Sequence, residues 1–544
     1  MSNGGARADF PIPADVQGFW QWDKMHCPRP MTPMAQELFH VLGRGFSDAM
    51  NEFSCPVGVV YRPINYYGFI GVVPFPGHDS PERLARYQKT MDDILPRMGD
   101  LWEHEWLPSI LPALERGRKA GYSAASDREL LSAVDRMFED LYARFIVHGK
   151  INFVTVSASL YADFYNEHLK PSDPTEPYAT LQGYPTRSLD AGRGLWQLSR
   201  MITADPVLKK AFETLAVDQL IPSLQGSTPG RKLLEALTAY LDEFGWRSDV
   251  FEPADKTWRE DPRIPLNALQ GYVRLGSSDD PNVRYRTAIE TRDRLLADAR
   301  RRLASDPARV ARFDQLHEMA RHYLTITENH NFYIDQVGIG VTRPLLLEIG
   351  QRLVRKGIAN DADSVFMLYR PELPDALSGK DFRAAIGQRR AELSHWAGVI
   401  PVPVISEPPP QPEKPDPLGG ALAKMFGIPV EPSRDPAVIV GIAASKGVAR
   451  GRAKVVRTLS EASKLQKGDI MVCELTMPPW TPLFSTVSAL VADTGGVLSH
   501  CAIVSREYGL PAVVGTRMGT AVIKDGMHLT VDGSKGIVRI DARG

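Results

Sequence analysis

The sequence predicts a multidomain protein of mixed class, which is mainly α-helical over its first three quarters and α/β at its C-terminal end. The chain has 544 residues, enough for about three to five domains. Apolar residues recur at helical spacing before residue 404, whereas short apolar strand candidates follow residue 437. A proline-rich segment separates the two patterns, so we expect a domain boundary there.

The composition is that of an ordinary globular protein, with 43% hydrophobic and 24% charged residues. Its 64 Lys and Arg nearly balance its 65 Asp and Glu, so we expect no nucleic-acid partner. Four scattered cysteines without a CxxC pair argue against a disulfide framework and a structural zinc site. No apolar leader is present, and every apolar run is far shorter than the roughly 20 residues of a membrane span. The sequence therefore predicts a soluble, cytoplasmic protein without a membrane partner.

Residues 1–404 form the first predicted region, which is mainly helical with an N-terminal part that contains β-strands. The first 75 residues are rich in proline, aromatic and β-branched residues, which favour strands and turns, and residues 57–75 predict a strand pair. Helical periodicity follows further along. The segments that show it best are 130–149, 287–304, 308–327 and 343–357.

Residues 405–436 form a predicted linker, which carries nine prolines. Such a composition favours an extended, semi-rigid spacer, and its central piece LGGALAKMF could form a short helix. The linker is either passive or a tether that lets the domain beyond it move.

Residues 437–544 form the last predicted domain, a compact α/β unit. Short apolar runs separated by glycines predict strands, and one helix is expected at about 499–508. The predicted strands are 437–444, 448–457, 469–474, 489–492, 512–514, 527–531 and 537–540.

The stretch TGGVLSHCAIVSREYGLPAVVG at 494–515 carries the clearest chemical signal. Gly495 and Gly496 follow a strand and let the backbone turn tightly, and a Ser499–His500 pair then opens a helix. Free N–H groups at a helix start favour an anion, and histidine can act as a covalent nucleophile. A His500 that carries a phosphoryl group would fit this position, with its oxygens held by this turn and by the hydroxyls of Thr494 and Ser499. The alternative is a Ser499 helix cap beside a structural histidine, and for a histidine considered alone this alternative is favoured.

The stretch resembles the swivelling phosphohistidine domain of the phosphoenolpyruvate (PEP)-utilising enzymes, a family that includes PEP synthase, pyruvate phosphate dikinase and rifampin phosphotransferase. The family pattern reads T-[DE]-x-GG-x-[ST]-[SC]-H-[AT]-A-I-x-[AS]-R-E-x-G-[IL]-P-[AC]-V-V-G. The chain matches it at Asp493, Gly495, Gly496, Ser499, His500, Ala502, Ile503, Ser505, Arg506, Glu507, Gly509, Leu510, Pro511, Ala512, Val513, Val514 and Gly515. The resemblance implies that His500 is the phosphorylated residue.

Some positions leave alternatives open. Ala492 and Leu498 stand where the pattern has hydroxyl residues, so one hydroxyl contact to the phosphoryl group is in doubt. Cys501 reads as a small helical residue, with a reactive thiol as the alternative because a helix start lowers a thiol pKa. Arg506 is expected to clamp phosphoryl oxygens, with a structural salt bridge as the alternative.

Residues 237–373 resemble the helical acceptor domain of rifampin phosphotransferase, and residues 19–39 resemble its opening. No GxxxxGK[ST] stretch is present. The chain looks most like the histidine-bearing subunit of split, phenylphosphate synthase-like enzymes that phosphorylate phenols or alkylphenols. This resemblance implies that residues 1–404 bind a phenolic or other hydroxyl acceptor, while a separate nucleotide-grasp subunit supplies ATP and Mg²⁺. We expect no cofactor or metal on this chain itself; whether the donor is ATP or PEP stays open.

Candidate acceptor-binding residues occur where aromatic and polar groups coincide. A phenolic acceptor needs an apolar pocket and a general base, for which His26 and His330 are candidates. The set comprises Trp22, Asp23, His26, Tyr61, Asn65, Glu328, His330 and Arg343. For each of them, an ordinary hydrogen-bonded role is the alternative. HEMARH at 317–322 is one residue too long for HExxH, so it does not predict a zinc site.

Three functions therefore compete. The first is a phosphotransferase subunit that acts on a phenol or another small hydroxyl compound. The second is an enzyme component with a different acceptor, either an antibiotic such as rifampin or pyruvate. The third is a non-enzymatic signalling protein in which phosphorylated His500 is recognised by a partner.

Overall fold

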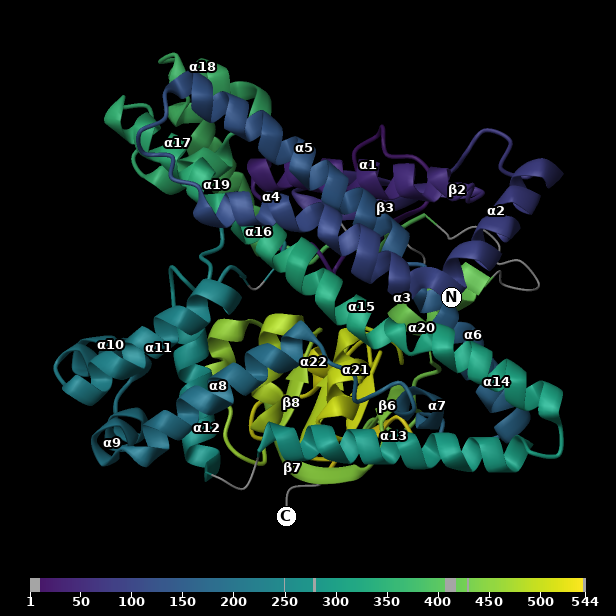
Figure 1. Ribbon diagram of the computed structural model, residues 1–544. Helices are drawn as coiled ribbons and strands as arrows, with labels where there is room; N and C mark the ends of the chain where they lie inside the picture. The colour runs from purple at the N-terminus through teal and green to yellow at the C-terminus, as the bar shows by residue number, and fades with distance from the viewer. Residues whose placement is uncertain (1–9, 249, 277–279, 407–416, 428–429, 542–544) are drawn as a thin grey trace. The chain divides into compact units, whose positions relative to one another are not determined.

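The computed structural model describes residues 10–248, 250–276, 280–406, 417–427 and 430–541 (Figure 1). These residues divide into two compact units. Unit 1 holds residues 10–152, 250–256 and 333–406, and unit 2 holds residues 153–248, 257–276, 280–332, 417–427 and 430–541. Parts of the predicted linker, 407–416 and 428–429, lie outside the described residues. The domain boundaries expected at 404/405 and 436/437 stay predictions.

Unit 1 contains a small antiparallel sheet, in the order β2-β3-β1-β4, and several helices. The strands are β1 (Trp20–Trp22), β2 (Val57–Ile64), β3 (Tyr67–Pro74) and β4 (Val404–Ile405). The helices include α1 (Pro33–Glu52), α2 (Pro81–Ile94), α3 (Met98–Leu101), α4 (Leu107–Lys119), α5 (Asp127–Ile151), α16 (Gly338–Gly340), α17 (Arg343–Arg355), α18 (Leu373–Leu377) and α19 (Arg383–Ala397). The predicted strand pair is confirmed as β2 and β3, and α5 and α17 confirm two predicted helices.

Helix α1 corrects the expectation that the first 75 residues consist of strands and turns. The helix begins after Thr32, whose hydroxyl accepts the Ala35 N–H, and Pro33 occupies its first position. Glu252 in turn accepts the N–H and hydroxyl of Thr32, at 2.9 and 2.8 Å. The Thr-Pro pair was the local start signal, and the high content of prolines and aromatics around it obscured that signal.

Helices α1 and α5 pack side by side (Figure 1). Glycines bring their backbones together, because a Cβ at Gly149 would lie 2.7 Å from the Ala49 Cβ and one at Gly45 would lie 2.7 Å from the Phe145 Cβ. This close approach fixes the rotation of α5 and therefore the direction of its polar side chains.

In unit 2, helices surround a mixed eight-stranded sheet. The strands are β5 (Val438–Val440), β6 (Ile442–Ser445), β7 (Val448–Val455), β8 (Ile470–Cys473), β9 (Ala489–Ala492), β10 (Ala512–Val514), β11 (His528–Asp532) and β12 (Ile537–Ile540). The helices include α6 (Val154–Leu169), α7 (Glu176–Ala179), α8 (Arg187–Ala204), α9 (Pro206–Thr214), α10 (Val217–Gln225), α11 (Thr228–Phe244), α12 (Arg263–Leu275), α13 (Pro281–Leu303), α14 (Pro307–Ala320), α15 (His322–His330), α20 (Pro417–Phe426), α21 (His500–Glu507) and α22 (Gly519–Val522). The strand predicted at 437–444 is two strands, β5 and β6, which separate at Gly441 and pair with β12 and β10. The other predicted strands and the predicted helix at 499–508 are confirmed, as is the mixed fold class.

The sheet has the order β5-β12-β11-β7-β8-β9-β10-β6, and β7 to β10 run parallel. Strands β8 and β9 are buried on both faces. Met471 and Leu490 pack into a core shared with helices of unit 2, whereas Val472 and Val491 pack against the other strands. Continuous apolar runs are what such doubly covered parallel strands require.

The predicted helix within the linker is confirmed as α20. Its Lys424 Nζ lies 2.7 Å from the Ser159 hydroxyl and 2.6 Å from the Asp163 carboxylate, so α20 is anchored to α6. Gly427, with φ +88°, ends the helix.

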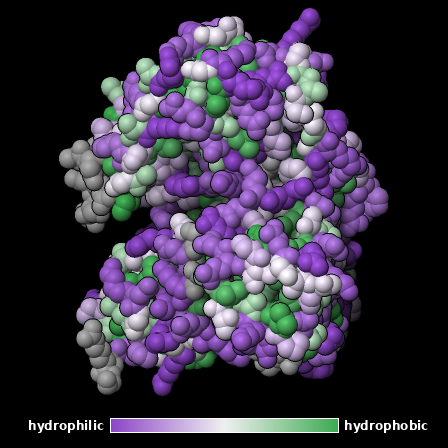
Figure 2. Space-filling view, turned by 90° about the vertical axis from the view of Figure 1, so that its left-hand side faces the viewer, coloured by the Kyte–Doolittle hydropathy of each residue, from purple (hydrophilic) through white to green (hydrophobic). Residues whose placement is uncertain are grey.

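The face shown in Figure 2 is covered mostly by hydrophilic residues, and hydrophobic ones are scattered among them. Within the described ranges, no helix combines the length and the apolar character that crossing a membrane demands.

The contact between α17 and residues 362–367 predicts the effect of one methyl group. A Cβ at Gly350 of α17 would lie 2.0 Å from the Ala362 carbonyl oxygen. Gly350→Ala is therefore expected to lower the free energy of unfolding by about 1–3 kcal/mol, measured by urea denaturation.

Gly387→Ala is the matched control. Gly387 is exposed on α19, and no described atom would lie within 4 Å of its Cβ. The substitution is expected to raise stability by about 0.5–1 kcal/mol because glycine destabilises helix interiors. Equal stability changes in both variants would contradict the packing of α17.

Candidate functional site

The loop that carries His500 starts at the carboxyl end of a central parallel strand. Strand β9 ends at Ala492, residues 493–499 form the loop, and α21 begins at His500. Gly495 has φ +93°, and a Cβ there would lie 2.7 Å from the Ser499 hydroxyl. Ligands of open α/β sheets bind at the carboxyl ends of the strands, so this position is suited to a reactive group.

Contacts on several sides hold the loop in place. The Gly496 N–H donates to the Met425 carbonyl at 2.9 Å, and the Leu498 N–H donates to the Lys424 carbonyl at 3.1 Å. A Cβ at Gly496 would lie 2.2 Å from the same Lys424 oxygen, so only glycine allows α20 to pack this closely. The hydroxyl of Tyr323 donates to the Leu498 carbonyl.

His500 pairs with a buried carboxylate. Its Nδ1 lies 2.9 Å from Glu328 Oε1, and the Glu328 side chain is only 2% exposed. Ser188, in the first turn of α8, donates its hydroxyl to Glu328 Oε2 at 2.8 Å. The positive end of the α8 dipole adds to the stabilisation of negative charge on Glu328.

The electrostatics of this pair define its protonation state. Burial raises the pKa of the Glu328 carboxyl, but the His500 imidazole and the Ser188 hydroxyl lower this pKa by a larger amount. The pKa of Glu328 therefore lies below its ordinary value. An ionised carboxylate only accepts hydrogen bonds, so the proton between the two groups is carried by His500 Nδ1. In the neutral imidazole, Nε2 then holds the lone pair, and no hydrogen-bond partner among the described residues occupies it. This is the nitrogen available as a nucleophile.

Ser499 and Thr494 use their hydroxyl protons on the backbone. Ser499 donates to the Gly496 carbonyl at 2.8 Å and accepts from the Ala502 N–H, so it caps α21. Thr494 donates to the Glu474 carbonyl at 2.9 Å. Both residues therefore shape the loop, and their contact with a phosphoryl group stays a prediction.

Among the described residues, the Arg506 guanidinium contacts a backbone carbonyl and an aromatic ring rather than a carboxylate. Its Nη1 donates to the Ala444 carbonyl at 2.8 Å, and its guanidinium lies 5.3 Å from the ring centre of Tyr178. Burial lowers the pKa of Arg506 to about 10, although Tyr323 and Tyr178 oppose this shift. The structure assigns Arg506 to packing of α21, and the expected oxygen clamp stays a prediction.

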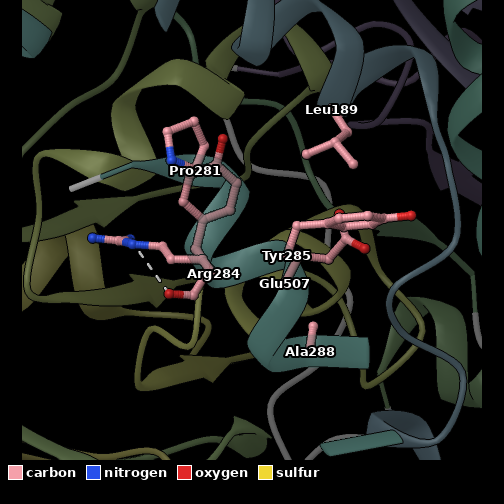
Figure 3. Close-up of a pocket in the computed structure, with 7 residues that line it drawn as sticks. Leu189, Pro281, Arg284, Tyr285, Ala288 and Glu507 are labelled. Carbon is pink, nitrogen blue, oxygen red and sulfur yellow. Dashed lines mark hydrogen bonds between the residues drawn. The ribbon is translucent and has the colours of Figure 1, made fainter. Parts of the chain in front are cut away.

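The C-terminal end of α21 rests on α13 (Figure 3). Leu189, Pro281, Arg284, Tyr285, Ala288, Glu507 and Tyr508 line a cavity of about 10 Å³, room for roughly one water. Arg284 Nη1 donates to the Tyr508 carbonyl at 3.4 Å, shown as the dashed line. Burial and the charge of Glu328 raise the pKa of Glu507 to about 8, so this carboxyl is protonated at neutral pH.

Cys501 is a buried structural residue of α21. It is buried, its Sγ contacts the Thr476 N–H and hydroxyl at 3.2 and 3.0 Å, and burial raises its pKa above the ordinary value. A reactive thiol would need the opposite shift.

The predicted acceptor residues divide between the units. Trp22, Asp23, His26, Tyr61, Asn65 and Arg343 lie in unit 1, whereas Glu328 and His330 lie in unit 2. Glu328 serves His500, and His330 Nδ1 contacts the Ile326 carbonyl at 3.1 Å. In unit 1, Asn65 forms the β2–β3 turn with φ +49°, and Arg343 donates to the Pro253 carbonyl at 2.8 Å. Their roles toward an acceptor stay predictions.

Two of these residues belong to a second polar cluster, in unit 1. His26 Nδ1 lies 2.7 Å from Asp23 Oδ2, and His148 Nδ1 lies 3.4 Å from Asp335 Oδ1. Burial lowers the pKa of His26, but Asp23 and Asp335 raise it to about 9 overall. A larger cavity of about 600 Å³ also lies in unit 1, lined in part by Tyr122, Arg136, Arg144, Val341 and Leu345.

Two family models match the chain. Residues 465–536 match the mobile domain of PEP-utilising enzymes, and residues 152–328 match the fourth domain of rifampicin phosphotransferase. The chain is thus a homologue of the PEP-utilising and rifampicin phosphotransferase enzymes. This homology confirms the resemblance of the histidine loop. The match to the fourth domain of rifampicin phosphotransferase covers residues 152–328, so it begins and ends earlier than residues 237–373, where the resemblance to the acceptor domain was predicted. The last matched residue is Glu328.

The chain is also similar to longer proteins. It is 31% identical to chondramide synthase cmdD of Chondromyces crocatus, over 98% of this chain and 14% of that protein. It is 29% identical to the uncharacterised phosphotransferase YvkC of Bacillus subtilis strain 168, over 97% of this chain and 62% of that protein. A rifampicin phosphotransferase of Streptomyces sviceus is 24% identical over 80% of this chain and 50% of that protein. The chain therefore spans between 14% and 62% of these relatives.

Sequence reasoning missed several residues of the site. Ser188 and Tyr323 carry no motif, and their partners lie 140 and 175 residues away in the sequence. Glu328 was proposed as an acceptor residue, whereas the structure pairs it with His500. The available signal was a group of polar residues beside aromatic ones, and such a signal names no partner.

The protonation of Glu507 predicts a pH-dependent stability. A carboxyl whose pKa rises from 4.5 to about 8 on folding contributes stability that is fully present below about 4.5 and is lost as the pH rises through 8. Glu507→Gln stays neutral, so its melting temperature relative to the wild type is expected to rise between about pH 5 and pH 8.

Glu235→Gln, which removes an exposed charge on α11, is the control and should show no such trend. A constant difference in melting temperature between wild type and Glu507→Gln across this range would show that Glu507 is ionised in the folded protein.

Proposed function

We propose that the chain is a phosphotransferase component in which His500 carries a phosphoryl group to a hydroxyl acceptor. The observation that carries this proposal is the 2.9 Å pair between His500 Nδ1 and the buried Glu328, which leaves Nε2 as the nucleophile. The match to the mobile domain of PEP-utilising enzymes and the similarity to proteins named as phosphotransferases support it.

The proposed cycle has two half-reactions. In the first, Nε2 attacks the phosphorus of the donor, an N–P bond forms, and the P–O bond to the leaving group breaks with its electron pair on oxygen. In the second, the acceptor oxygen attacks the phosphorus, the N–P bond breaks, and its electron pair returns to Nε2. The hydroxyl proton passes to a base. Both steps depend on in-line geometry more than on further covalent chemistry.

For the first half-reaction, we propose that a separate subunit with a nucleotide-grasp domain transfers the phosphoryl group from ATP, bound with Mg²⁺. The resemblance of the sequence to the histidine-bearing subunit of split, phenylphosphate synthase-like enzymes supports this arrangement. PEP is the alternative donor, since the mobile domain is named for enzymes that use it.

For the second half-reaction, we propose a small phenol or alkylphenol as the acceptor. Aromatic side chains accompany the polar residues of unit 1: Trp22 and Tyr61 are buried there, and the Tyr61 ring contacts Phe39 at 4.5 Å. A buried, aromatic-rich environment of this kind suits a phenol. The similarity to rifampicin phosphotransferase over 80% of the chain supports a second candidate, an antibiotic acceptor.

Replacing His500 tests the carrier role. The full chain would be incubated with ATP labelled at the β- or γ-phosphate, with and without a lysate that contains the products of neighbouring genes, and with labelled PEP. We expect acid-labile, alkali-stable label on the wild type and none on His500→Ala, because a phosphoramidate is stable only in alkali. Label that appears on the chain only when lysate is added supports a separate subunit. Label from ATP on the pure chain would overturn the proposal of a separate subunit.

His528→Ala is the matched control, because this histidine is exposed on β11 of the same sheet. It should be labelled like the wild type. Label that persists in His500→Ala would overturn the carrier role. So would the absence of label on the wild type with both donors. The labelled chain would then be chased with phenol, alkylphenols and rifampicin, and the compound that removes the label identifies the acceptor class.

Replacing Glu328 tests its role in setting the tautomer. In Glu328→Gln the side-chain amide can donate to Nδ1, which places the imidazole proton on Nε2 and blocks the nucleophile. We expect the rate of His500 labelling to fall on the order of 10²- to 10⁴-fold, as in other histidine–carboxylate pairs.

Glu318→Gln, an exposed residue on α14, is the control. Ser188→Ala should cause a smaller loss, because it removes one of the hydrogen bonds that Glu328 accepts. An unchanged labelling rate in Glu328→Gln would show that the carboxylate only holds the loop.

A further inference from the structure

His26, His148 and Asp335 converge in unit 1 although they are far apart in the sequence. Each offers one ligand atom, and these three atoms all lie within 4.8 Å of one another. His26 follows β1, His148 lies in the last turns of α5, and Asp335 belongs to the π-helix Asn331–Val337. π-Helical turns occur often at functional sites.

The cluster is enclosed. The side chains of His148 and Asp335 are 4% and 7% exposed, and that of His26 is 11% exposed. Aromatic rings surround it, since Phe46 contacts His148 at 4.5 Å and Phe251 contacts His26 at 6.1 Å between ring centres. Buried charged groups of this kind are stable when they pair with one another or coordinate a metal.

An outer carboxylate orients His26. Asp23 Oδ2 lies 2.7 Å from His26 Nδ1, and Asp23 Oδ1 accepts the His26 N–H at 3.2 Å. This contact leaves His26 Nε2 to face the cluster. Histidine ligands of metal sites are held in the same way, by a carboxylate on the second ring nitrogen.

The backbone fixes the second histidine. Gly149 follows His148, and the close packing of α5 on α1 at Gly149 sets the direction of the neighbouring imidazole. Two imidazoles and one carboxylate are ligands typical of Zn²⁺ and related divalent transition metals.

We propose that His26, His148 and Asp335 bind a divalent transition metal, with Asp23 as the outer-sphere partner of His26. Three protein ligands leave a coordination position for an oxygen ligand. That position would take the acceptor hydroxyl and lower its pKa, a role that rests on the proposed function; metal binding itself does not.

Metal titration of the full chain tests the proposal. Metal-free protein would be titrated calorimetrically with Zn²⁺ and, separately, with Mn²⁺, and the dialysed protein would be analysed for metal content. We expect one equivalent of bound metal per wild-type chain. His148→Ala and Asp335→Asn should lose it, whereas His317→Ala, which removes a different buried histidine, should keep it.

Asp23→Asn keeps the ligands and removes only the outer carboxylate. We expect its metal affinity to fall roughly 10- to 100-fold. Co²⁺ would report the site in the wild type through the intense visible absorption of low-symmetry coordination, so the test does not depend on the folding of any variant. No stoichiometric binding to the wild type, or equal affinity in wild type and Asp23→Asn, would overturn the proposal and leave two metal-free His–Asp pairs. No ATP or acceptor is present in this experiment, so failure to label His500 would leave its result unchanged.

Discussion

The candidate site depends on one buried ionic hydrogen bond, between Glu328 and His500. A carboxylate at 2% exposure is costly unless it is fully paired. Glu328 is paired on both oxygens, by His500 and by Ser188 at the start of α8. The same two contacts that make the charge tolerable also decide which imidazole nitrogen carries the proton. Stability and reactivity therefore come from one arrangement.

The loop before His500 shows how much of a site local sequence determines. Gly495 needs a positive φ, Gly496 admits the α20 backbone, and Ser499 caps α21. Each requirement restricts a residue type at a fixed offset, so the loop and the position of His500 at the start of the helix were predictable from the motif. Helix α1 was not, because its Thr32–Pro33 start is surrounded by prolines and aromatics that favour other structures.

Residues joined by tertiary packing left no comparable signal. Glu328 and His500 are 172 residues apart, and His26, His148 and Asp335 come from three separate segments. A side chain that is reached by folding is restricted by its partner rather than by its neighbours in sequence. The sequence indicated Asp23, His26 and Glu328 as polar groups beside aromatics, but it singled out neither His148 nor Ser188. Only the packing of α5 on α1 and the direction of α8 give them their positions.

In the proposed cycle, the Glu328 carboxylate acts on the two half-reactions in opposite senses. By accepting the hydrogen bond from Nδ1–H it increases electron density on Nε2, which makes that nitrogen a stronger nucleophile toward phosphorus. The same density strengthens the N–P bond and makes the imidazole a poorer leaving group when the acceptor attacks. The acceptor must then be the better nucleophile, which for a hydroxyl means losing its proton before or during attack. Nε2 is enclosed in the structure, so the groups that face it must move aside for three phosphoryl oxygens, whereas Glu328 lies on the other nitrogen and can stay in contact. The carboxylate thus favours the phosphorylated form of His500. Transfer of the phosphoryl group to the acceptor then depends on a base or metal that activates the acceptor hydroxyl.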